Sequence, residues 1–143
     1  MSRPAAPARA DFRHWQTVTT RWADNDAYGH VNNTVYYQWF DSVVNAWLVE
    51  RGLLDIAAGD PIALVAETGC AYFAPLSFPG EVEVGLVVAE LGRSSVRYRI
   101  GVFAPGAATA AAAGEFVHVA VGRNDRRPVP WPEAWRAALA SLS

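Results

Sequence analysis

The sequence predicts an α+β fold, in which an antiparallel sheet of about five strands is wrapped around one long central helix. Two observations carry this prediction. The segment 34–51 has the length and pattern of a helix that is apolar on most of its sides. From residue 61 onward, four segments with the alternating pattern of strands follow one another, separated by turns that contain glycine or proline. A hydrophobic content of 52% and a charged content of 18% in 143 residues favour a single domain with a substantial core.

The N-terminal residues 1–11 are rich in proline, alanine and arginine, and no apolar segment follows them. They are predicted to form a disordered tail rather than a signal peptide, which leaves residues 12–143 as the folded domain. Segment 14–22 contains threonine, valine and tryptophan in loose alternation and is predicted as the first strand. A polar loop follows and ends in Asn32 and Asn33, either of which is a suitable N-cap for a helix.

The central helix is predicted from residue 34 to about residue 51, and Gly52 is a suitable residue to end it. Its polar residues form one narrow stripe with the spacing i, i+3, i+4 and i+7, and they are Gln38, Asp41, Ser42 and Asn45. The rest of the helix surface is aliphatic or aromatic. We therefore expect this helix to be buried, with the sheet covering most of it.

The four later strands are predicted over residues 62–73, 81–91, 94–103 and 108–122. A bulge is expected in the first of them, near Gly69. The second and third have the clearest alternation, with valine and other apolar residues on one face and glutamate or arginine on the other. The segment 133–142 is predicted as a short amphipathic C-terminal helix.

Charge and composition argue against several classes of protein. A net charge of −2 gives no indication of a nucleic-acid partner. The longest uncharged run, residues 100–114, is too short and too interrupted by proline and glycine to span a membrane. The single cysteine, Cys70, cannot form an internal disulfide and is predicted as a buried apolar residue in a reducing compartment. The cytoplasm is therefore the expected location.

The chain lacks the usual signatures of metal, serine and nucleotide chemistry. Its histidines, His14, His30 and His118, are scattered without the spacing of metal ligands. There is no Gly-x-Ser-x-Gly elbow, no P-loop and no dinucleotide-binding fingerprint. The polar loop before the helix carries two acids, Asp24 and Asp26. A carboxylate there can act as nucleophile or general base while the first free N–H groups of the helix polarise a carbonyl, although each acid could instead serve only its own loop.

The run Asp24-Asn25-Asp26-Ala27-Tyr28-Gly29-His30-Val31-Asn32-Asn33, followed by Tyr36 and the aromatic helix, resembles the hot-dog-fold acyl-CoA thioesterases, and among them the 4-hydroxybenzoyl-CoA thioesterase-like branch. The resemblance extends over residues 14–130. It implies a sheet wrapped around the helix, a homodimer whose two sheets join edge to edge, and often a tetramer. It also implies active sites at the subunit interface and hydrolysis of an acyl-CoA without a metal or other cofactor.

By this resemblance Asp26 is the catalytic carboxylate and the backbone N–H near Asn33 polarises the thioester oxygen, while Asp24 shapes the loop. The candidates for substrate contacts are Gly29, His30, Tyr36, Glu67, Arg93 and Arg126. Gly29 would give the backbone freedom near the ligand. For His30, orienting Asp26 or the substrate and making a structural hydrogen bond both stay open. Tyr36 belongs to the core, to the acyl pocket, or to both.

Three of these candidates depend on how the subunits assemble. Glu67 interrupts an apolar strand, and it could face the site of a partner subunit or lie in solvent at an edge. Arg93 and Arg126 are candidates for the phosphates of coenzyme A. The expected activity is therefore hydrolysis of an acyl-CoA. Two alternatives stay open: hydrolysis of an acyl group on acyl carrier protein, and a hot-dog module that binds an acyl ligand without catalysis.

Overall fold

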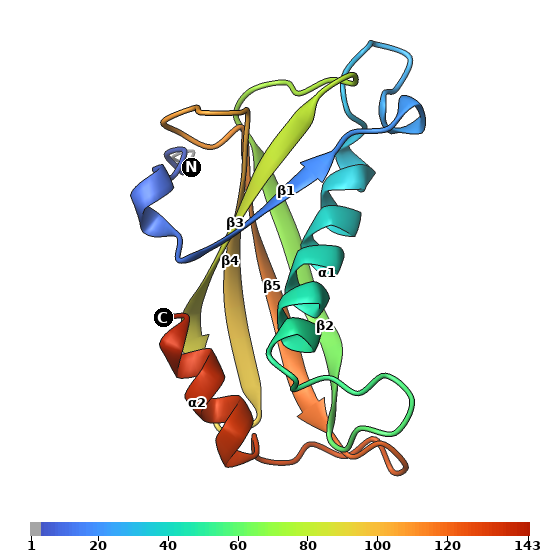
Figure 1. The fold of residues 1–143 in the computed structure, drawn as a ribbon, viewed down its shortest axis with the longest axis vertical. Helices are drawn as coiled ribbons and strands as arrows, with labels where there is room; N and C mark the ends of the chain where they lie inside the picture. Colours follow the sequence, from blue (N-terminus) through green and yellow to red (C-terminus); the bar gives the residue numbers. More distant parts are fainter. Residues whose placement is uncertain (1–3) are drawn as a thin grey trace.

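The computed structural model describes residues 4–143, which form one antiparallel sheet with a long helix against one of its faces (Figure 1). In chain order, the elements are η1 (Arg9–Asp11), β1 (His14–Thr19), η2 (Trp22–Asp24), α1 (Asn33–Glu50), β2 (Ile62–Tyr72), β3 (Glu81–Leu91), β4 (Ser95–Phe103), β5 (Ala112–Val121) and α2 (Glu133–Ser141). The strand order in the five-stranded sheet is β1-β3-β4-β5-β2. The α+β, hot-dog prediction is confirmed, with element ends that differ by a few residues.

Helix α1 is buried because its surface is apolar on most sides. Its buried residues are Val35, Tyr36, Trp39, Phe40, Val43, Val44, Trp47 and Leu48. They pack on the inner face of the sheet, where Leu86, Tyr98 and Ile100 are fully buried. The polar stripe predicted from the sequence faces away from this core, and Gln38 and Asp41 are exposed. Burial of this face fixes α1, and with it the loop that precedes α1, against the sheet.

Two details of the strands differ from the prediction. The bulge in β2 lies between Val65 and Glu67 rather than near Gly69, because the register against β5 shifts at that point. Strand β5 begins at Ala112 rather than residue 108. The residues before it form a turn, in which Ala107 N–H donates to the carbonyl oxygen of Ala104 at 3.0 Å.

The N-terminal segment is ordered where the sequence suggested a tail. Phe12 lies on the outer face of the sheet beside Phe103, and a methyl group added at Gly85 or Gly101 would come within 2.8 or 2.6 Å of the Phe12 ring or its Cβ. Arg9 lies over the Phe103 ring at 4.9 Å and forms an ion pair with Glu83 at 2.9 Å.

Backbone hydrogen bonds hold the residues just before this cluster. The carbonyl oxygen of Pro7 accepts from Ala110 N–H at 3.0 Å, and Arg9 N–H donates to the carbonyl oxygen of Ala108 at 3.2 Å. The prediction that residues 1–11 are disordered is therefore wrong for residues 7–11, and residues 1–3 lie outside the described part of the chain.

Strand β2 forms one free edge of the sheet, since β5 is its only neighbour in the described residues. Leu64 and Val65 in this strand are 39% and 48% exposed. No helix within residues 4–143 is long and apolar enough to cross a membrane.

Candidate functional site

Asp26 lies in a tight hairpin between η2 and α1, and Asp24, the other acid of the predicted site, is the last residue of η2. Asn25 and Val31 form a bridge between its two arms, and Asp26 N–H donates to the carbonyl oxygen of His30 at 2.8 Å. The turn closes through Gly29 N–H, which donates to the Asp26 carbonyl oxygen at 3.1 Å. Gly29 has φ +81°, a left-handed conformation that glycine adopts without strain. The sequence Asp26–Gly29 therefore turns the chain while keeping Asp26 at the start of the turn.

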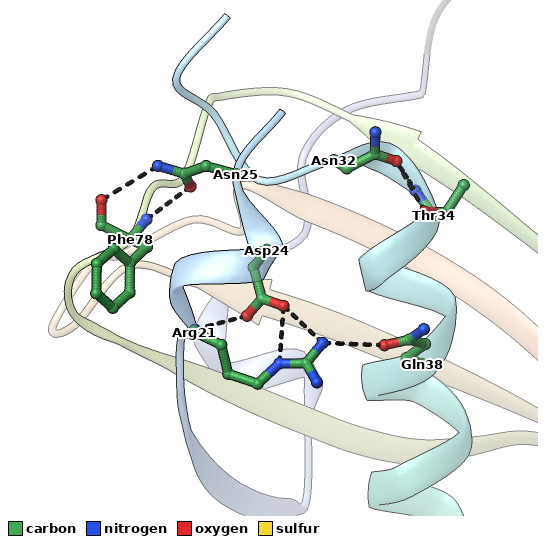
Figure 2. Close-up of polar contacts among 7 residues, drawn as sticks. All are labelled: Arg21, Asp24, Asn25, Asn32, Thr34, Gln38 and Phe78. Carbon is green, nitrogen blue, oxygen red and sulfur yellow. Dashed lines mark hydrogen bonds and ion pairs between the residues drawn. The ribbon is translucent and has the colours of Figure 1, made fainter. Parts of the chain in front are cut away.

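The segment that leads into β3 holds this hairpin from one side. The side-chain amide of Asn25 accepts from Phe78 N–H at 2.9 Å and donates to the Phe78 carbonyl oxygen at 3.3 Å (Figure 2). Ser77 Oγ donates to the Gly29 carbonyl oxygen at 2.9 Å. Val31 N–H donates to the carbonyl oxygen of Leu76 at 2.8 Å. These bonds contact both arms and the turn of the hairpin. The segment that leads into β3 therefore helps to fix the position of the hairpin on the sheet.

Among the residues that the structure describes, the first turn of α1 leaves one N–H without an acceptor. Asn32 is the N-cap: its Oδ1 accepts from Thr34 N–H at 2.9 Å and from Thr34 Oγ1 at 2.8 Å (Figure 2). The Asn32 carbonyl oxygen accepts from Val35 N–H at 3.0 Å. Within residues 4–143, no acceptor binds the N–H of Asn33. Of the two asparagines, Asn32 therefore caps the helix, and Asn33 offers a free donor at its positive end.

Within residues 4–143, Asp26 presents one carboxylate oxygen that has no hydrogen-bond donor. Its Oδ1 accepts from Tyr28 N–H at 2.8 Å, which closes a local turn, and no donor binds Oδ2 in the described part of the chain. Asp26 is half-buried, whereas His30 is exposed. The imidazole of His30 makes no hydrogen bond to Asp26 within residues 4–143, and the two residues are joined only through their backbones. A role for Asp26 as an acceptor within its own loop therefore accounts for Oδ1 and leaves Oδ2 available.

A pocket of about 390 Å³ opens between the hairpin, the start of α1 and the end of β2. Its lining residues are Asp26, His30, Val31, Asn33, Tyr36, Tyr72, Phe73, Ala74 and Pro75. The pocket therefore brings together four residues predicted from the sequence: Asp26, His30, Asn33 and Tyr36. Asp26 is the only carboxylate that lines it among the described residues.

Tyr72 is a pocket residue that the sequence did not indicate. Its hydroxyl donates to the Asn33 carbonyl oxygen at 2.9 Å, and its ring packs edge-on against Tyr36 at a centroid distance of 5.1 Å. Tyr72 lies at the end of β2, and nothing local in the sequence indicates that this strand end meets the start of α1. The hydroxyl ties the strand to the residue whose N–H is free.

The other predicted residues lie elsewhere in the chain. Glu67 is on β2 and forms an ion pair with Arg97 at 3.3 Å, beside a separate cavity of about 300 Å³. Arg93 is in the turn between β3 and β4, where its carbonyl oxygen accepts from Trp131 N–H at 3.0 Å. Arg126 follows β5. Figure 1 places both of these turns at the α2 end of the sheet, opposite the loop before α1. Within one chain, these three residues do not meet Asp26.

A comparison with protein families matches residues 20–139 to the thioesterase-like superfamily. The chain belongs to this superfamily. Its fold is also similar to the solved structure of the PA5185 protein from Pseudomonas aeruginosa strain PAO1, with 52% identity, 97% of each chain covered and a TM-score of 0.94. The PA2801 protein of Pseudomonas aeruginosa is 30% identical, with 88% of this chain and 97% of that chain covered and a TM-score of 0.80.

A more distant structure shares the fold alone. It is Slr0204, a 1,4-dihydroxy-2-naphthoyl-CoA thioesterase from Synechocystis, with 21% identity, 90% of this chain and 96% of that chain covered and a TM-score of 0.80. A search of the curated proteins found no match. Membership of the superfamily supports thioester hydrolysis as the general activity.

In this thioesterase-like chain, burial raises the pKa of three groups in or beside the pocket. Burial, with the nearby Cys70 as a smaller cause, raises the pKa of Tyr36 to about 12. Burial likewise raises the pKa of Tyr72 above its ordinary value and that of the Cys70 thiol to about 11. At neutral pH these three groups are protonated, so none of them is an anionic nucleophile or base. This leaves Asp26 as the carboxylate available for chemistry in the pocket.

Proposed function

We propose that this protein hydrolyses an acyl-CoA to the free acid and coenzyme A, with Asp26 as the catalytic carboxylate and the N–H of Asn33 as the donor to the thioester oxygen. One observation carries the proposal: a carboxylate with a free oxygen and a helix N–H without an acceptor line the same pocket. Within the described residues, neither Oδ2 of Asp26 nor the N–H of Asn33 has a hydrogen-bond partner. Thioester hydrolysis requires a carboxylate of this kind and a donor to the carbonyl oxygen.

The chemistry follows from these two groups. The thioester oxygen would take the hydrogen bond of Asn33 N–H, at the positive end of α1, and this polarises the carbonyl carbon. In one route Oδ2 of Asp26 attacks that carbon, the C–S bond breaks to release the thiolate, and water then hydrolyses the mixed anhydride. In the other route Asp26 takes a proton from a water that attacks the carbon directly, and the C–S bond then breaks to release the thiolate. Loss of an oxyanion donor of this kind lowers kcat about 10²–10³-fold.

The rest of the pocket suits an acyl group. Val31, Tyr36, Phe73 and Pro75 supply an apolar and aromatic wall beyond the reacting centre. Gly29 closes the hairpin that carries Asp26, and His30 lies at the exposed rim, where it can contact the substrate.

Coenzyme A needs cations for its phosphates, and no arginine lines the Asp26 pocket within residues 4–143. We propose that a second copy of the chain supplies them, in a homodimer joined along the free edge of β2. A homotetramer would arise from two such dimers. Arg93, Arg126 and Glu67 then act at the site of the partner subunit. Exposed Leu64 and Val65 on the free strand favour this edge as the interface. The proposed location is the cytoplasm, supported by the single cysteine.

The same absence of arginine favours a second candidate, an acyl group carried on acyl carrier protein. Thiol release from a panel of acyl-CoAs and acyl carrier protein thioesters tests both candidates, with wild type beside Asp26→Asn and Asp41→Asn. Asp41 is an exposed carboxylate on α1, so Asp41→Asn is the matched control. We expect activity on an acyl-CoA that falls about 10²-fold or more only in Asp26→Asn. No activity on any thioester would contradict hydrolysis and leave the acyl-binding module, which binding of the same panel would detect.

A further inference from the structure

The hairpin that carries Asp26 is fastened at its base by a buried carboxylate. The side chain of Asp24 is 0% exposed, whereas that of Arg21 is 63% exposed. Oδ1 of Asp24 accepts hydrogen bonds from Nε and Nη2 of Arg21 at 3.0 and 2.8 Å, and Oδ2 accepts one from the Arg21 backbone N–H at 2.7 Å. Burying a carboxylate is unfavourable unless its oxygens are bonded. A single residue supplies all of these bonds to Asp24.

The backbone of Asp24 also forms hydrogen bonds with the segments before and after the hairpin. Its N–H donates to the Arg21 carbonyl oxygen at 2.9 Å, and its carbonyl oxygen accepts from Asn32 N–H at 2.8 Å. Nη2 of Arg21 also reaches Oε1 of Gln38 on α1 at 3.4 Å (Figure 2). The pair therefore joins the segment after β1, the base of the hairpin and the second turn of the helix.

These bonds lie close in sequence to both groups of the proposed reaction. Asp24 lies two residues before Asp26, and Asn32 lies directly before Asn33. We propose that the Arg21–Asp24 ion pair sets the Asp26 carboxylate in place relative to the Asn33 N–H, which makes Arg21 and Asp24 positioning residues. This inference rests on the proposed function. Neither residue lines the pocket, so both act through the residues they hold.

Stability alone is a weak reason for such a pair. Asp24 is buried whereas Arg21 is largely exposed, and a buried carboxylate with its partner is often no more stabilising than well-packed apolar side chains of similar volume. Directional bonds do what apolar contacts cannot, because they fix an orientation as well as a distance. A displacement of about 1 Å at a reacting group can lower the rate about 10²-fold. The loss on breaking the pair should therefore appear in kcat rather than in KM.

The test uses Asp24→Asn and Arg21→Lys, with Arg9→Lys as the matched control. Arg9 forms an ion pair with Glu83 on the outer face, so the control weakens an arginine–carboxylate pair away from the pocket. In thiol release we expect kcat to fall about 10²-fold in Asp24→Asn and about 10-fold in Arg21→Lys, with KM within about 3-fold of wild type. Arg9→Lys should keep the wild-type kcat. Folded variants with wild-type kcat, or an equal loss in Arg9→Lys, would overturn the proposal.

Amide hydrogen exchange gives a second readout that does not depend on activity. The Asn32 N–H should exchange faster in Arg21→Lys and Asp24→Asn than in wild type, and at the wild-type rate in Arg9→Lys. Unchanged exchange in the first two variants would overturn positioning even if kcat falls. If the wild-type protein hydrolyses no thioester, the proposed function fails and the exchange result alone decides whether the ion pair holds the hairpin. Arg21→Lys keeps the test available if Asp24→Asn does not fold.

Discussion

His118 should make the stability of this protein fall in mild acid. Its side chain is 1% exposed on the inner face of β5, where its ring lies 5.9 Å from Tyr98 and 4.9 Å from Phe116, centroid to centroid. Its Nδ1 has no hydrogen-bond partner among the described residues. Burial lowers the pKa of His118 from 6.5 to about 4, so the imidazole is neutral in the folded protein at neutral pH.

The sign of the effect follows from the two pKa values. The unfolded chain binds a proton at His118 below pH 6.5, whereas the folded protein binds it only near pH 4. The free energy of unfolding therefore decreases as the pH falls through this window, by up to ~1.4 kcal/mol per pH unit. The difference of about 2.5 units, from 6.5 to about 4, corresponds to a total of ~3 kcal/mol.

Urea unfolding at pH 7 and pH 4.5 measures this loss in wild type and in His118→Leu, with His30→Gln as an exposed control. Acids that titrate in both proteins cancel in the comparison. We expect wild type and His30→Gln to lose ~2–3 kcal/mol more than His118→Leu between these pH values. A loss in His118→Leu equal to that of wild type would mean that the proton uptake belongs to a group other than His118.

Three further substitutions test other parts of the structure. Asn32→Ala removes the cap of α1 and should lower the free energy of unfolding by ~1 kcal/mol in urea; no change would mean that the cap does not stabilise the helix. Phe12→Ala empties the space over Gly85 and should cost ~3–5 kcal/mol in the same measurement, while a loss below ~1 kcal/mol would contradict ordered packing of the N-terminal segment. Tyr72→Phe removes the hydroxyl bound to the Asn33 carbonyl oxygen and should cost ~0.5–1.5 kcal/mol while lowering kcat more than it raises KM; an effect on KM alone would argue for a substrate contact instead.

The elements of the fold could be predicted because their signals are local. Apolar and polar residues alternate along β3 and β4, and apolar residues recur along α1 with the period of a helix. The order of residues alone therefore indicates these elements. Features that depend on which segments meet could not be predicted. Phe12 is ordered because glycines on β3 and β4 leave room for its ring, and Gly85 and Gly101 are distant from it in sequence.

The same distinction between local signals and contacts of distant segments holds for the site. Asp26, Gly29 and Asn33 belong to one short run, so their meeting at the start of α1 follows from the motif and the helix signal. Tyr72 enters the pocket from β2, and the contact depends on how the strand crosses the helix. Arg93 lies at the far end of the sheet because β3 leads away from the hairpin, so within one chain it does not meet the pocket.

In the proposed reaction, the Asp26 carboxylate attacks the thioester or activates the water that does so. The most direct measurement is kcat for Asp26→Asn relative to wild type on the best thioester of the panel, with equal folding of both proteins verified by their unfolding curves. The substitution replaces one oxygen and nearly preserves the shape of the side chain. We expect kcat to fall about 10²-fold or more while KM changes little. A folded Asp26→Asn protein with the wild-type kcat would exclude Asp26 as the catalytic carboxylate.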